Sequence, residues 1–261
     1  MLRPWPAQDG GLVRIRAVGG EVSEEMLHSL AEVSATFGDG DLHLTKRANL
    51  QLRGLPLRDG LLAPEVEEAL LRLVPSPTHE LVRNVMVSPL TGVSGGRADL
   101  RPLARALDVA LCADPVLASL PGRFLVVLDD GRGDLADRPL DLGVVAVSGE
   151  DVQLRAGSAW GPVVPIDAAT SALLRLAHGF LDARGDGPGA AWHVDELAVP
   201  LLDGPRDPRT RASAGPTPYG RGEGYEHRAI PGGVLTPELL AGLPAGPVIV
   251  TPWHGLLALD R

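Results

Sequence analysis

Apolar and polar positions near the N-terminus predict a strand, a helix and a second strand in succession. The first strand spans residues 12–18 and is followed by Gly19-Gly20. The helix spans residues 23–37, beginning at a serine N-cap and ending before a glycine. The second strand spans residues 41–55, where leucines alternate with polar residues.

The same order of elements returns later in the chain. Residues 225–230 predict a strand, Gly232-Gly233 a turn, Thr236-Pro237 the start of a short helix, and residues 248–259 a closing strand. Thr45 and Thr251 align without a gap at the start of each final apolar run. A strand–helix–strand unit cannot bury its own sheet face. We therefore expect the two copies, residues 12–55 and 225–259, to share one sheet about a pseudo-twofold axis.

The region between the copies alternates helix and strand patterns. Helices are predicted at residues 61–74, 97–111 and 167–183, the last capped by Asp167, and strands at residues 124–128, 142–147, 151–154 and 163–166. Residues 129–134 form a turn rich in glycine and aspartate. Residues 203–223 are rich in proline, glycine and arginine without a hydrophobic period, which is typical of an exposed linker.

Composition narrows the class of protein. The chain of 261 residues is 44% hydrophobic, but no apolar run approaches the roughly 20 residues that span a bilayer. A net charge of −9 argues against general binding to nucleic acid or membrane surfaces, which favour basic proteins. Pro4, Pro6 and Asp9 interrupt the N-terminal region where a signal peptide would be apolar, and the lone Cys112 fits a reducing compartment. We expect a cytoplasmic protein.

Four short motifs carry a family resemblance. They are the segment 44–54 (LTKRANLQLRG), the segment 82–92 (VRNV, then SPLTG), the segment 120–131 (LPGRF, then DDG), and residues 251–255 (TPWHG). In this order, on a duplicated frame, the chain resembles the family of nitrite and sulfite reductases and precorrin-3B synthases. The last motif is similar to the cobalamin-pathway branch of that family.

The resemblance implies an α+β fold of nitrite/sulfite reductase type, with duplicated ferredoxin-like half-domains around a mixed α/β domain. The implied divisions are a first half-domain at residues 11–78, a mixed domain at 79–202, a linker at 203–223 and a second half-domain at 224–261. The implied function is that of a precorrin-3B synthase-like protein of cobalamin biosynthesis. Such a protein binds precorrin-3A, a tetrapyrrole, for oxidation and hydroxylation of the macrocycle.

Arginine suits such a ligand, because the macrocycle carries eight carboxylates and the guanidinium fork binds carboxylates bidentately. Only Lys46 among the 24 basic residues is lysine. By resemblance, Arg47, Arg83 and Arg123 face the macrocycle, and we expect them to converge on one concave surface.

Further candidate ligand residues follow from the same motifs. Alternation along the predicted strand 41–55 places Arg47, Asn49, Gln51 and Arg53 on one face and Leu50 and Leu52 on the other. The remaining candidates are Lys46, Asn84 and His254. His254 stands where the precorrin branch has arginine, and Leu125 stands where the reductases have a second lysine.

The cysteine count separates this chain from its family. The resemblance implies a [4Fe–4S] cluster, with sirohaem in the reductases, and the cluster needs about four thiolates. Cys112 is the single cysteine, and the chain stops where the family's cysteine segment would begin. We expect protein without a cluster that does not oxidise precorrin-3A alone. Three readings stay open: an enzyme, a non-catalytic tetrapyrrole-binding module, and one half of a split enzyme whose cluster lies on a separate chain.

Other constellations in the sequence are weaker. The run His193-Val194-Asp195-Glu196 reads as strand-like, which would spread its side chains over both faces, and we assign no metal site. Residues 92–96 form a glycine-rich loop without a Walker lysine. No residue is assigned a catalytic role from the sequence.

Overall fold

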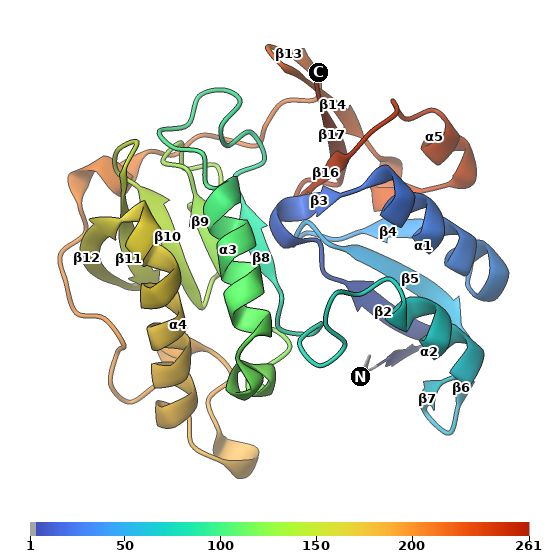
Figure 1. Ribbon diagram of the computed structural model, residues 1–261, viewed down its shortest axis with the longest axis horizontal. Coiled ribbons are helices and arrows are strands. Elements are labelled where there is room, and N and C mark those ends of the chain that lie inside the picture. The colour runs from blue at the N-terminus through green and yellow to red at the C-terminus, as the bar shows by residue number, and fades with distance from the viewer. Residues whose placement is uncertain (1–3, 261) are drawn as a thin grey trace. The chain divides into compact units, whose positions relative to one another are not determined.

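The computed structural model describes residues 4–260, which form two compact units. The first unit runs through Leu81 and resumes at Pro218, and the second spans Val82–Thr217. The second unit is thus an insertion into the first. Figure 1 colours the second unit from green to orange, and the two stretches of the first unit mainly blue and red. Within the described residues, no helix is long and apolar enough to cross a membrane.

The first unit contains the two predicted repeats. Its elements in the N-terminal repeat are β1 (Trp5–Ala7), β2 (Gly10–Ile15), β3 (Glu21–Val22), α1 (Glu24–Phe37), β4 (Leu42–Leu44), β5 (Leu50–Leu55), β6 (Leu57–Arg58), β7 (Leu61–Leu62) and α2 (Pro64–Leu71). Those of the C-terminal repeat are β13 (Gly220–Gly222), β14 (Tyr225–Ala229), β15 (Val234–Leu235), α5 (Pro237–Ala241), β16 (Val248–Thr251) and β17 (Gly255–Leu259). The α+β class predicted from the sequence is confirmed.

The repeats form two sheets that exchange edge strands. One sheet has the order β1-β2-β5-β4-β15, and the other has the matching order β13-β14-β17-β16-β3. Val22 of β3 pairs with Val248, and Leu235 of β15 pairs with Leu42. The expectation of one shared sheet is wrong. Each repeat instead completes the sheet of the other.

The glycine pairs redirect the chain toward the opposite sheet. Gly19 and Gly20 have φ of 65° and 75°, and the matching pair Gly232 and Gly233 has φ of 60° and 74°. A Cβ on Gly20 would lie 2.3 Å from the Val250 carbonyl oxygen, so the close approach also requires glycine. These turns direct β3 and β15 into the sheet of the other repeat.

Each predicted final strand is a hairpin. Residues 41–55 fold as β4 and β5, and residues 248–259 as β16 and β17. Oγ1 of Thr45 accepts from the Asn49 amide at 3.1 Å, and Oγ1 of Thr251 accepts from the Gly255 amide at 3.2 Å. These side-chain bonds close the turns, in which Ala48 and His254 have φ of 56° and 61°. The prediction of continuous strands is therefore wrong, while the threonine alignment marks equivalent turns.

Helices cover the apolar face of the first sheet. Leu50 and Leu52 of β5 are at most 1% exposed and belong to one core with Leu30 of α1 and Leu70 of α2. Ser23 caps α1 as predicted, accepting from the Met26 amide at 3.1 Å. The opposite face of the same sheet carries polar side chains, among them Arg14 and Gln51.

The second unit is a mixed sheet of order β12-β11-β10-β9-β8. Its elements are β8 (Val85–Val87), α3 (Arg101–Cys112), β9 (Val126–Asp129), β10 (Leu142–Ala146), β11 (Asp151–Ala156), β12 (Ala159–Pro165) and α4 (Ile166–Ala183). Strands β8, β9 and β10 are parallel, and the others antiparallel. Figure 1 shows α3 and α4 side by side over this sheet. The rings of Phe124 and Phe180 pack at a tilt, with 5.2 Å between their centroids.

Two local predictions in this unit need correction. Helix α4 begins one residue earlier than predicted, with Pro165 at the N-cap and Asp167 in the first turn without a capping bond. The segment Val194–Glu196 is a 3-10 turn rather than strand-like, because the His193 side chain accepts from the Asp195 amide. Residues 204–207 lie against β11 and β12, where Gln153 bonds to Pro205 and Asp207. The predicted domain boundaries stay predictions.

Candidate functional site

The predicted ligand residues are divided between the two units. Lys46, Arg47, Asn49, Gln51 and His254 lie in the first unit. Arg83, Asn84 and Arg123 lie in the second. Convergence of the three arginines therefore stays a prediction, and the chemistry of each unit is described separately.

The polar face of the first sheet carries arginines from β2. Arg14 pairs across from Gln51, which fixes both side chains on one face, opposite the core-facing Val13 and Leu52. Arg16 is the residue that follows the end of β2, and alternation carried one residue further assigns it to the same side as Arg14. Arg14 is exposed, Gln51 is 9% exposed and Arg16 is 8% exposed. The prediction omitted Arg14 and Arg16, although their alternation with Val13 and Ile15 is visible in the sequence.

Arg47 and Lys46 lie in the turn between β4 and β5, and not on a strand as predicted. Lys46 is exposed, whereas Arg47 is half-buried, with its amide donating to Thr45 Oγ1 at 3.4 Å. The turn thus brings Arg47 to the end of the face that carries Arg14 and Arg16.

Like charges act on one another at this end of the sheet. The pKa of the Arg16 guanidinium is lowered to about 10, chiefly by burial and in smaller part by the positive charges of Arg14 and Arg47, against the raising effect of Glu80. Glu80 is fully buried and accepts from the Arg16 amide at 2.6 Å. Arg14, Arg16 and Arg47 are called the arginine cluster below. An anion bound there would relieve their mutual repulsion.

The two candidate asparagines bond to backbone. Asn49 is 1% exposed, and its Oδ1 accepts from the Ala17 amide at 3.0 Å, tying the hairpin turn to the end of β2. Asn84 is equally buried, and its Nδ2 donates to the Phe124 carbonyl at 3.2 Å. Each bond joins two segments that are distant in the sequence and so stabilises the fold.

Arg83 in the second unit is clamped by an acidic residue of α3. Its Nε donates to Asp108 Oδ1 at 2.7 Å and its Nη2 to Asp108 Oδ2 at 2.8 Å, a bidentate pair. The side chains are 5% and 21% exposed. Arg123 is exposed, in the turn that precedes β9.

His254 occupies a strained position in the second hairpin turn. It is half-buried with φ of 61°, and Cγ of its ring lies 3.2 Å from where a Cβ on Gly233 would be. It therefore packs over the glycine pair of its own repeat.

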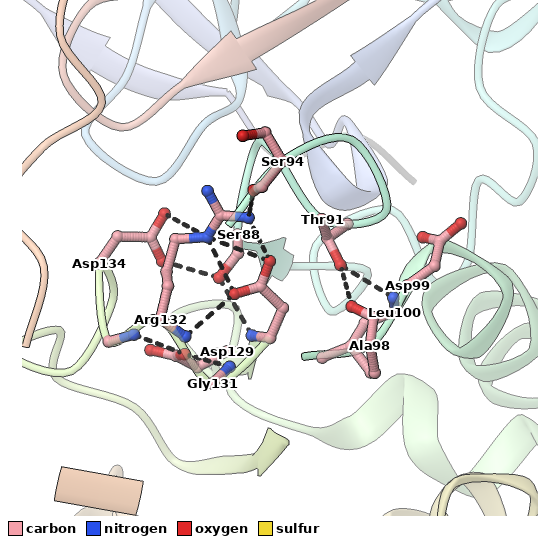
Figure 2. Close-up of polar contacts among 12 residues, drawn as sticks. Ser88, Thr91, Ser94, Ala98, Asp99, Leu100, Asp129, Gly131, Arg132 and Asp134 are labelled. Atoms are coloured by element: carbon pink, nitrogen blue, oxygen red, sulfur yellow. Dashed lines mark hydrogen bonds and ion pairs between the residues drawn. The ribbon is translucent and has the colours of Figure 1, made fainter. Parts of the chain in front are cut away.

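A network of carboxylates follows β9, at the loop 129–134 (Figure 2). Among the described residues, Asp129, Asp130 and Asp134 form the group whose carboxylate oxygens could hold a metal ion, all within 4.8 Å of one another. Arg132 forks onto Asp130, with its Nη2 at 2.6 Å from Oδ2, and Ser88 donates to Asp134 at 2.7 Å.

Burial controls the protonation of this network. The pKa of Asp134 is raised to about 7, chiefly by burial and in part by the negative charge of Asp129, and burial raises the pKa of Asp129 as well. From the sequence, residues 129–134 were predicted as a turn, and residues 129–131 were part of a family motif, but no polar network was predicted there. The signal for a polar network was three aspartates after a buried strand.

Neighbouring polar contacts order the glycine-rich loop 92–96. Thr91 Oγ1 donates to the Ala98 carbonyl and accepts from the Leu100 amide, each at 2.9 Å, which closes the loop before α3 (Figure 2). Arg132 Nη2 reaches the Ser94 carbonyl at 2.5 Å. Helix α3 therefore starts at Arg101, four residues later than predicted.

Cysteine ligands for an iron–sulfur cluster are not present in this chain. Cys112 is half-buried on α3, and its Sγ donates to Asp108 Oδ1 at 3.9 Å. One thiol does not fit the roughly four thiolates that a [4Fe–4S] cluster needs. His193 lies within 4 Å of Asp141 and Asp195, but these three do not form a compact ligand set with a second histidine or a cysteine among the described residues.

The repeat that carries the arginine cluster has a known family. Residues 6–73 match the model described as the nitrite/sulfite reductase ferredoxin-like half domain. This part of the chain belongs to that family. The resemblance drawn from the sequence motifs is thereby confirmed.

Similar curated proteins come from both branches of this family. The chain is 32% identical over 163 residues to a precorrin-3B synthase of Sinorhizobium sp, covering 61% of this chain and 33% of that protein. It is 29% identical over 222 residues to a ferredoxin–nitrite reductase of Synechococcus elongatus, covering 72% and 42%. The matched parts of the chain thus cover less than half the length of these relatives.

A solved structure extends the likeness to the fold of most of the chain. The Mycobacterium tuberculosis NirA protein aligns over 96% of this chain and 54% of its own, with a TM-score of 0.70 and 18% identity. At this identity the match shows the fold alone. The predicted nitrite/sulfite reductase type of fold is confirmed.

Proposed function

We propose that this nitrite/sulfite reductase-type protein binds a polycarboxylate tetrapyrrole, in the manner of a precorrin-3B synthase acting on precorrin-3A. The arginine cluster on the polar face of the first sheet carries the proposal, because three guanidiniums that repel one another are stabilised by a polyanion. The 32% identity to a precorrin-3B synthase favours this branch of the family.

The chain's own residues would bind and orient the macrocycle. Arg47 in its turn and Arg14 on β2 would each hold a peripheral carboxylate, and the buried Arg16 would supply positive charge behind them. Gln51 would donate a neutral hydrogen bond between these arginines. Glu80 would keep the buried Arg16 charged, since its carboxylate opposes the effect of burial. No redox step is assigned to these residues.

A titration with uroporphyrin III, which carries eight carboxylates, tests the binding. Arg47→Ala and Arg14→Ala should each weaken binding by about 1.5–3 kcal/mol if the contacts are shielded, charge-assisted bonds. Arg72→Ala is the matched control, because Arg72 pairs with Glu68 on the exposed side of α2. Equal affinity in all four proteins would remove the arginine cluster from the site.

A second candidate is a non-catalytic tetrapyrrole carrier, and the single cysteine favours it. Iron and acid-labile sulfide analysis of anaerobically purified protein separates the candidates. We expect tetrapyrrole binding without sulfide, and no oxidation of precorrin-3A by this chain alone. Stoichiometric sulfide would contradict the carrier. Activity restored by a separate cluster-bearing chain would instead favour a split enzyme.

A further inference from the structure

Two buried carboxylate oxygens of the loop 129–134 have no hydrogen bond. They are Oδ2 of Asp129 and Oδ2 of Asp134, and the two residues are 2% and 4% exposed. A buried polar atom without a partner is costly, so in native proteins it is usually satisfied by an ordered water, a proton or an ion. The hydrogen bonds of the protein itself leave these two oxygens unsatisfied.

The other oxygen of each carboxylate is fixed in place (Figure 2). Oδ1 of Asp129 accepts from the amides of Gly131 and Gly133, at 2.8 and 3.0 Å. Oδ1 of Asp134 accepts from the Ser88 hydroxyl at 2.7 Å. Each carboxylate is therefore held by one oxygen and offers the other. A ligand that binds two oxygens ordered in this way loses little entropy of the protein.

The charge of the group favours a cation over a neutral water. Arg132 forms ion pairs with Asp130, at 2.6 Å, and with Asp134, at 3.9 Å, and no cation of the described residues lies within 4 Å of the Asp129 carboxylate. Three ionised carboxylates and one guanidinium leave a net charge of −2, which a divalent cation would cancel. Buried charge of this size is costly unless it is compensated.

The spacing of the oxygens fits a calcium ion. One carboxylate oxygen from each of Asp129, Asp130 and Asp134 lies within 4.8 Å of the others, so a single ion can contact all three. Ca²⁺ binds oxygens at about 2.3–2.6 Å, and two oxygens that share the ion are then at most about 5 Å apart. Mg²⁺ has shorter bonds and usually keeps several waters, which suits a buried group of carboxylates less well.

We propose that Asp129 and Asp134 bind a calcium ion through their Oδ2 atoms, with Asp130 as the third carboxylate of the site. The ion would hold the loop 129–134 against the end of β9 and so stabilise the second unit. Without the ion, a proton on Asp134 takes its place, because burial raises the pKa of this carboxyl group. The site includes no residue of the arginine cluster, and it is therefore independent of tetrapyrrole binding.

A calcium titration of the full chain, after removal of metals by a chelator, tests the site. Calorimetry should show a single Ca²⁺ bound per wild-type chain. Asp129→Asn and Asp134→Asn should each weaken this binding by roughly tenfold or more, because each removes a charged ligand oxygen. In both variants the amide oxygen can keep the bonds that Oδ1 accepts. Asp137→Asn is the matched control, because Asp137 is an aspartate of the same segment whose side chain is 88% exposed.

Thermal unfolding gives a second measurement of the same site. Ca²⁺ should raise the melting temperature of the wild type and of Asp137→Asn, because a ligand that binds only the folded state stabilises it. It should not raise the melting temperature of Asp134→Asn. If Asp129→Asn does not fold, Asp134→Asn decides the test, since its amide can still accept from Ser88.

Two results would overturn the calcium site. One is wild-type protein that binds no Ca²⁺ at millimolar concentration, which would mean that a water or a proton satisfies the two oxygens. The other is equal Ca²⁺ affinity in the wild type and the three variants, which would indicate diffuse attraction to a chain of net charge −9. Neither result would affect the tetrapyrrole proposal, which rests on residues of the first unit.

Discussion

The Asp134 carboxyl group titrates near neutrality in the folded protein, because burial raises its pKa to about 7 from an ordinary value of 3.8. The folded state therefore binds more protons than the unfolded state between these two pH values. Stability from this group is complete below pH 4 and is lost as the pH rises through about 7. The raised pKa of Asp129 acts in the same direction.

We expect Asp134→Asn to remove part of this dependence. The amide oxygen can still accept from Ser88, and the variant carries no charge to bury. The unfolding free energy of the wild type should fall between about pH 4 and pH 7 by up to about 1.4 kcal/mol per pH unit, and that of Asp134→Asn should fall less. Chemical denaturation at several pH values measures this, with Asp137→Asn as an exposed control. Identical slopes in the three proteins would contradict the expectation.

At single positions, the sequence identified candidate residues but did not predict the contacts that surround them. Arg47 was found through its motif, but its place in a turn depends on the Thr45 side chain, which alternation does not describe. The acidic partner of Arg83 was missed because Asp108 lies on a helix 25 positions later. Contacts of this kind depend on tertiary packing, which a local pattern does not encode.

At the scale of elements, the glycine turns before β3 and β15 predict a larger loss of stability for one alanine substitution than for the other. Gly20→Ala should destabilise the protein by about 2 kcal/mol or more, because alanine is strained at positive φ and its Cβ would meet the Val250 carbonyl oxygen. Gly233→Ala should cost less, since its nearest backbone contact, Leu44 oxygen, is 3.1 Å away. Denaturant titrations measure both.

Gly215→Ala serves as the control for these turns. Nothing lies within 4 Å of its added Cβ, and its φ is not positive, so the change should stay within about 0.5 kcal/mol. Equal losses in all three variants would mean that the close approach at Gly20 does not matter.

Most helices and strands could be predicted from periodicity, caps and glycines, as for α1 with its Ser23 cap. Pairing between elements could not, because a two-residue strand such as β3 has no period to detect. The hairpins were read as single strands, because the segments on either side of each short turn are both rich in apolar residues. The register and the pairing partner of a short strand such as β3 depend on which sheet edges remain unpaired after the larger elements have packed.

At the scale of the whole molecule, strand exchange should make the two repeats open together. Peptides from β3 and β16 pair with one another, as do peptides from β15 and β4, so neither sheet can lose its edge alone. In hydrogen exchange, Gly20→Ala should reduce protection in both sheets of the first unit and leave β9 and β10 unchanged. Loss confined to the N-terminal repeat would argue against cooperative opening.

The insertion of the second unit also sets an order of events during synthesis on the ribosome. Residues 82–217 form a continuous unit that can fold while the first repeat still lacks its partner. Until residues 234–235 emerge, the edge of β4 stays unpaired, and an open edge can join strands of other chains. The bond between Gly246 and Glu24 then joins positions 222 apart. Strand β15 of the C-terminal repeat covers this open edge, so slow translation after residue 217 should lower the yield of folded protein.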